Sequence, residues 1–155
     1  MIIMAIDPGN ERSAWVLYDS EDQKIKGCGI EPNSERLRRL QYNMGADVLA
    51  MEMVACYGMG VGQSVFETCV WIGRFIQKWP GAWRYIYRLD VKMALCHDSR
   101  AKDANIRQAI IDRFPATGGG KCPQIGTKAK PGPLYGVSKD MWAALAVALT
   151  AAEKP

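Results

Sequence analysis

The chain opens with an apolar run that ends abruptly at a carboxylate. Residues 1–6 are all apolar, Asp7 follows them directly, and Pro8-Gly9-Asn10 comes next. The run is too short to cross a membrane and lacks the basic start and cleavage site of a signal peptide, so it predicts an interior β-strand. The Pro-Gly-Asn sequence favours a turn that would hold Asp7 at the rim of the core. A carboxylate there needs a partner or a bound cation, although an Asp7 that only caps its own turn accounts for this segment equally well.

Two further acidic residues occupy comparable positions. Glu52 follows the apolar run 48–51, so a second buried strand is expected to deliver a carboxylate. Asp140 is expected in the first turn of a final alanine-rich helix that Ser138 caps, on the face that also carries Ala143. An isolated acid is favoured near a helix N-terminus, but three converging carboxylates repel one another unless a divalent cation binds them. Ligation by oxygen alone favours Mg²⁺ or Mn²⁺.

The remaining patterns predict one α/β domain over residues 1–155. The chain is long enough to bury the core of such a domain. Three initial strands followed by alternating helices and strands indicate a mixed sheet that starts with an antiparallel meander. Further strands are expected at 13–18, 24–30 and 83–87, and helices at 33–44, between 62 and Pro80, at 90–95, at 103–114 and at 138–152.

Cysteine usage and hydropathy indicate a soluble cytoplasmic protein. The five cysteines never form a C-x-x-C pair, which argues against a disulfide framework and against a zinc site. Reduced thiols are typical of the cytosol. The sequence contains no stretch of eighteen apolar residues, so no membrane association is expected.

Positive charge is concentrated in one part of the chain. Residues 99–139 carry a net charge of +6, whereas the rest of the chain carries −2. Within this part, residues 116–136 contain six glycines, three prolines, three lysines and no acid, which predicts a long basic loop with a function of its own. Charge on one side is typical of a surface that binds a polyanion, so nucleic acid is the expected partner.

Several short segments, taken in order, resemble the RuvC family of Holliday junction resolvases within the ribonuclease H-like superfamily. The similarity spans most of the chain. The segments that carry it are Ile6-Asp7-Pro8-Gly9-Asn10, Ala14-Trp15-Val16-Leu17, Met51-Glu52-Met53-Val54, 91–110 and 140–148. The long basic loop is most similar to the phage-encoded members of this family.

The resemblance implies a ribonuclease H-like fold, with a mixed five-stranded sheet and helices on both faces. It implies a homodimeric endonuclease that cuts branched DNA such as Holliday junctions with two Mg²⁺ or Mn²⁺ ions. Asp7 would bridge both ions, and Glu52 and Asp140 would each hold one. Lys102 or Lys139 would contact the phosphate at or beside the cut. The base-stacking aromatic of the family falls on Ala55 here, so Tyr57, two residues on, is the candidate to stack on a base, although an ordinary rim tyrosine accounts for it equally well. With the basic segment, the residues expected to bind DNA are Lys102, Arg107, Lys121, Lys128, Lys130, Lys139 and Tyr57.

One departure from the family leaves the fourth metal ligand open. Family members carry an acid or a histidine one turn after the first acid of the last helix, and this chain has Ala143 there. Asp103, Asp98 and His97 are the nearest candidates to replace it. The alternative is a branched-DNA-binding module without catalysis. A nucleotide cofactor is not expected, because the P-loop spacing fails at Cys122 and 155 residues supply only one lobe of an actin-like ATPase.

Overall fold

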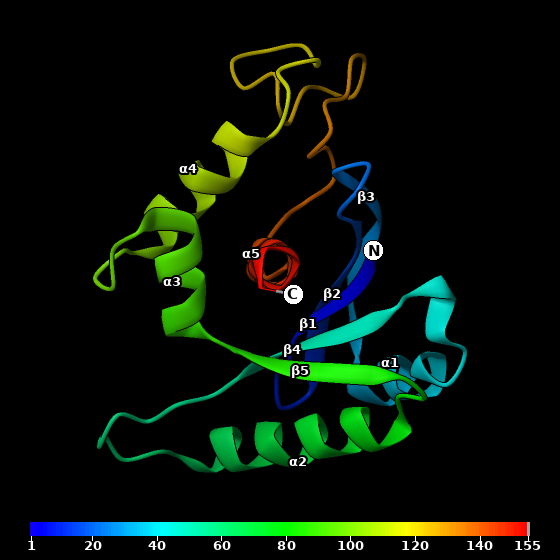
Figure 1. The fold of residues 1–155 in the computed structure, drawn as a ribbon, viewed down its shortest axis with the longest axis vertical. Helices are drawn as coiled ribbons and strands as arrows, with labels where there is room; N and C mark the ends of the chain where they lie inside the picture. The colour runs from blue at the N-terminus through cyan, green and yellow to red at the C-terminus, as the bar shows by residue number, and fades with distance from the viewer. Residues whose placement is uncertain (155) are drawn as a thin grey trace.

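A computed structural model describes residues 1–154 and contains one five-stranded sheet (Figure 1). The strand order is β3-β2-β1-β4-β5. The first three strands form the expected antiparallel meander, and β4 and β5 run parallel to β1. This confirms the predicted mixed sheet. The strands are β1 (Ile2–Asp7), β2 (Arg12–Asp19), β3 (Lys24–Pro32), β4 (Val48–Met53) and β5 (Ala82–Tyr87).

Helices cover both faces of the sheet because the buried strands are apolar on both sides. Met4 and Ile6 of β1 pack in a cluster with residues of α1 and α2, and Ile3 and Ala5 pack on the opposite side with α3, α4 and α5. Figure 1 shows α5 end-on between the sheet and α3, with α2 below the sheet. The helices are α1 (Asn33–Leu40), α2 (Gln63–Lys78), α3 (Arg88–Cys96), α4 (Asp103–Arg113) and α5 (Met141–Glu153).

Two helix boundaries differ from the prediction by three residues or more. The helix expected to reach residue 44 ends at Leu40, and a separate 3₁₀ turn, η1 (Asn43–Gly45), follows it, because Asn43 and Met44 both adopt positive φ angles. The prediction that Ser138 caps the last helix is wrong. Lys139 has a φ of 50° and turns the chain, so α5 begins only at Met141.

The segment between α4 and α5 folds on itself without forming a helix or a strand, apart from an isolated bridge between Gly126 and Pro131. Its backbone is hydrogen-bonded internally, from Gly118 N to Pro123 O and from Gly132 N to Ile125 O. A Cβ atom on Gly132 would lie 2.3 Å from a backbone oxygen, so only glycine fits there. Residues 116–136 form a projection beyond α4, at the end of the molecule opposite α2 (Figure 1). We call these residues the basic projection.

No helix within residues 1–154 combines the length and the apolar character that a membrane crossing requires.

Candidate active site

Asp7 and Glu52 meet at the carboxyl ends of two neighbouring parallel strands. The β1–β4 register pairs Ile6 with Met51, so the next pair is Asp7 and Glu52. Side chains alternate along a strand, which puts both acids on the face that packs against α5. The two carboxyl groups lie close enough for each to shift the pKa of the other. Ligands of open α/β sheets bind outside the carboxyl ends of the strands, which is the edge that this pair occupies.

Burial makes this pair of acids costly to ionise. Desolvation, the charge of Glu52 and the charge of Asp140 raise the pKa of Asp7 to about 8. Burial also raises the pKa of Glu52, although the guanidinium of Arg88 acts in the opposite direction. The Oε2 atom of Glu52 is buried and has no hydrogen-bond partner. Without a cation, the pair therefore retains a proton near neutral pH and leaves one acceptor unsatisfied.

A buried polar network fixes the turn that follows Asp7. Gly9 N donates to Ser13 Oγ at 3.2 Å, and Ser13 Oγ donates to Asn33 Oδ1 at 2.6 Å. Asn33 Nδ2 in turn donates to Gly9 O at 2.8 Å, which closes the network. A Cβ on Gly9 would lie 2.2 Å from Arg12 O, so the turn requires glycine. The sequence signal for this network is Ser13, a small polar residue that the fold buries within β2.

Asp140 lies close to this pair but is not in contact with it. It is the exposed residue immediately before α5, not a residue of its first turn as predicted, and it receives no side-chain capping bond. Its charge raises the pKa of both Asp7 and Glu52. Within residues 1–154, no three Asp, Glu, His or Cys side chains are close enough to hold one ion as they stand. The structure thus joins two of the three predicted carboxylates and puts the third within electrostatic range.

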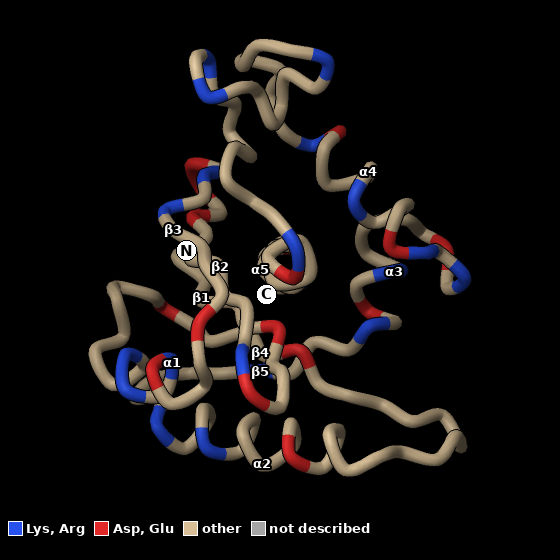
Figure 2. The backbone as a smooth tube through the Cα atoms, turned by 180° about the vertical axis from the view of Figure 1, so that it is seen from behind, with Lys and Arg blue, Asp and Glu red and all other residues tan. Residues whose placement is uncertain are grey.

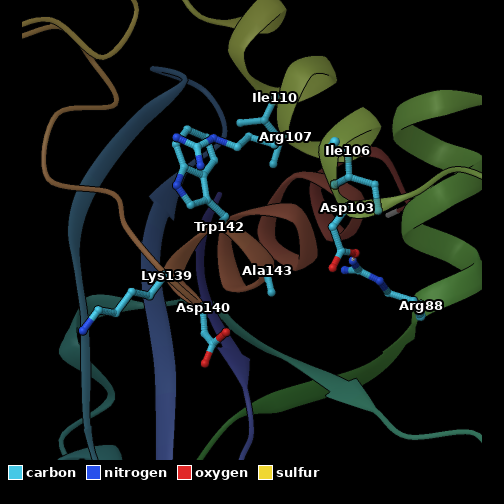
Figure 3. A pocket seen from close by; sticks show the side chains of 10 residues that line it. Arg88, Asp103, Ile106, Arg107, Ile110, Lys139, Asp140, Trp142 and Ala143 are labelled. Carbon is cyan, nitrogen blue, oxygen red and sulfur yellow. Dashed lines mark hydrogen bonds and ion pairs between the residues drawn. The ribbon is translucent and has the colours of Figure 1, made fainter.

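Two residues that the sequence did not single out as a pair, Arg88 and Asp103, border the same region (Figure 3). Arg88 is the first residue of α3 and forms an ion pair with Asp103, the first residue of α4. It lines both the cleft of about 250 Å³ that contains Asp7 and Glu52 and a neighbouring cavity of about 370 Å³. Arg88 reaches this edge because β5 runs parallel to β4 and ends just before it. A residue that directly follows a parallel strand is therefore the sequence signal that could have identified Arg88.

The residues predicted to bind DNA fall into two groups. The first group consists of three residues that border the site, Arg107, Lys139 and Tyr57, together with Lys102, which is exposed just before α4. Arg107 and Lys139 line the larger cavity, where the Arg107 guanidinium stacks 4.5 Å from the ring centroid of Trp142. Tyr57 is 70% exposed and lines the smaller cleft. The second group is exposed on the basic projection, which Figure 2 shows at the opposite end of the molecule from α2, and consists of Lys121, Lys128 and Lys130.

Comparison with solved structures identifies the fold. Neither models of protein families nor curated protein sequences match the chain. RuvC from Thermus thermophilus superposes with a TM-score of 0.65 and 17% identity, over 97% of this chain and 92% of that one. The chain has the RuvC fold. T. thermophilus RuvC in complex with its Holliday junction substrate superposes similarly, with a TM-score of 0.64 and 16% identity over 97% and 91% of the two chains. The RuvC fold confirms the predicted ribonuclease H-like architecture.

Proposed function

We propose that this chain is a metal-dependent endonuclease that cuts branched DNA such as Holliday junctions. The observation that carries the proposal is the half-buried, electrostatically coupled pair of Asp7 and Glu52 at the carboxyl edge of a RuvC fold. Two partly desolvated carboxyls in contact are unfavourable for stability alone, because one of them must hold a proton to avoid repulsion. Neighbouring carboxyl groups with raised pKa values are typical of functional sites.

The side chains at this edge suit a hard divalent cation. All the candidate donors are oxygens, and the buried Glu52 Oε2 lacks a partner that a cation would supply. We propose Mg²⁺ or Mn²⁺, two ions in all, with Asp7, Glu52 and Asp140 as ligands. When bound, such ions activate water and stabilise charge on the phosphate that is cut.

The chain's own residues would position the DNA around this edge. Arg88 presents a guanidinium beside both acids, and its geometry is suited to phosphate oxygens. Arg107 and Lys139 on the wall of the neighbouring cavity would hold the adjacent phosphates, since cations near a polyanion release counterions on binding. Tyr57, beside the cleft, offers an exposed ring on which an unpaired base can stack.

The decisive experiment compares Asp7→Asn with the unmodified chain on a four-way junction, a flap and a linear duplex. Asp7→Asn removes a ligand and a negative charge, so cleavage should be lost while junction binding is kept or strengthened. Asp112→Asn is the matched control, because Asp112 is exposed on α4 and accepts a hydrogen bond from Gln108 of the same helix. Full cleavage by Asp7→Asn would refute the assignment. An unmodified chain that binds junctions tightly but cuts none with Mg²⁺ or Mn²⁺ would instead support the non-catalytic alternative.

We also propose that two copies act together, because a four-way junction has two symmetric strands to cut. Analytical ultracentrifugation of the chain bound to a junction measures this directly. We expect two chains for each junction. One chain per junction at concentrations that support paired cuts would contradict it.

A further inference from the structure

We infer that Asp103, carried by α4, supplies the carboxylate that the last helix lacks at Ala143. This inference rests on the proposed nuclease function and concerns one residue of its metal site. The α5 helix cannot itself provide a second acid here, because Ala143 faces the cavity with only a methyl group. The space beyond that methyl group is bordered by Asp103 on one side and Asp140 on the other (Figure 3).

Asp103 borders the same cavity as Asp140 and Ala143. Arg88 lines both that cavity and the cleft that contains Asp7 and Glu52, so the two spaces share a wall. Asp98, the other acid considered from the sequence, lines neither space and accepts a hydrogen bond from the backbone amide of Arg100. This position distinguishes Asp103 from Asp98.

The side chain of Asp103 is exposed and is held by an ion pair at the surface. It is 90% exposed, and among residues 1–154 its ion-pair partner is Arg88. Arg88 also lines the cleft that contains Asp7 and Glu52, and its own side chain is 32% exposed. Arg88 thus stands between Asp103 and the strand acids as a counter-charge. A divalent cation among the four carboxylates would take over that role and release Arg88 toward phosphate.

Binding of Mn²⁺ to the metal-free protein without DNA tests the inference independently of catalysis. Electron paramagnetic resonance measures free Mn²⁺ during titration of the unmodified chain, Asp103→Asn and the matched α4 control Asp112→Asn. We expect Asp103→Asn to weaken Mn²⁺ binding by at least about tenfold, since even supporting residues of metal sites contribute that much. Asp112→Asn should bind Mn²⁺ as the unmodified chain does.

A double variant separates loss of a ligand from release of Arg88. If Asp103 only neutralises Arg88, then removing both charges with Arg88→Gln and Asp103→Asn should restore Mn²⁺ binding. That result, or unchanged binding in Asp103→Asn, would overturn the inference. Weak binding that persists in the double variant supports it.

Asp7→Asn, titrated in parallel, distinguishes this inference from the proposed function. Loss of Mn²⁺ binding in Asp7→Asn but not in Asp103→Asn would reject the role of Asp103 and leave the nuclease proposal standing. Unchanged binding in both variants would reject the metal site as a whole.

Discussion

At the scale of single residues, the main feature is a proton that Asp7 keeps in the folded chain. The pKa of Asp7 rises from its ordinary value of 3.8 to about 8, mainly through burial. The folded chain therefore holds a proton that the unfolded chain releases above about pH 4. This proton makes the stability of the fold and the binding of a cation depend on pH in opposite ways.

In the metal-free protein, stability should fall as pH rises toward 8. Between the two pKa values the folded state binds more protons than the unfolded state, so the free energy of unfolding decreases with increasing pH. Asp7→Asn cannot ionise and should show a flatter dependence. Melting temperatures in EDTA from pH 5 to 9 measure both slopes, and equal slopes would contradict the raised pKa.

Mg²⁺ should stabilise the protein more at pH 8 than at pH 6. A bound cation must displace the proton shared by Asp7 and Glu52, and this displacement becomes easier as pH rises. The measurement is the gain in melting temperature on adding Mg²⁺ at each pH. Asp112→Asn should keep this trend, whereas a gain that does not vary with pH would argue against cation binding at the pair.

Ser13→Ala should destabilise the fold through Asn33. The substitution leaves the buried Asn33 amide oxygen without its donor and Gly9 N without its acceptor, at a cost of about 1–3 kcal/mol. Urea unfolding measures this change. Ser64→Ala, at an exposed position on α2, is the control and should lie within about 0.5 kcal/mol of the unmodified chain.

At the scale of elements, the sequence predicts which segments form helices and strands better than how their ends meet. Short apolar runs that end in an acid identify β1 and β4, because a strand buried on both faces is apolar throughout and becomes polar only where it leaves the core. The start of α5 is missed because the positive φ of Lys139 is not visible in residue types. The ion pair of Arg88 and Asp103 is also missed, because it joins α3 and α4 and the relative placement of these helices depends on tertiary packing.

The basic projection should bind DNA without taking part in the cut. Its three lysines are exposed, and the projection lies at the end of the molecule opposite α2 (Figure 1). Replacing Lys121, Lys128 and Lys130 with alanine should reduce the salt dependence of junction binding by up to about three phosphate contacts. The rate of cleavage at saturating DNA should not change. Binding titrations over a range of salt concentrations test this, and an unchanged slope would assign the projection another role.

At the scale of the whole molecule, the site lies at the rim of a sheet whose stability comes from elsewhere. One buried cluster lies under α1 and α2 and the other under α3, α4 and α5, and neither includes Asp7 or Glu52. The fold is thus built from apolar contacts that a cation does not touch. Cleavage and folding should therefore respond separately to metal removal.

EDTA should abolish cleavage and leave the protein folded. Far-UV circular dichroism before and after chelation should be unchanged, because both hydrophobic clusters stay intact. Restoring Mg²⁺ should then restore cleavage. Unfolding on chelation would mean that the metal, and not the apolar clusters, holds the chain together.

The alanines of α5 have a further consequence. Ala144, Ala146 and Ala148 are completely buried, and α5 contacts β1 and β2. Because these side chains are small, α5 packs close to the elements around it, and Asp140 directly precedes the first residue of that helix. One added methylene beneath α5 would tilt or lift it and change the spacing between Asp140 and the strand acids. The distance between Asp140 and the strand acids thus depends on methyl groups that lie outside the site itself.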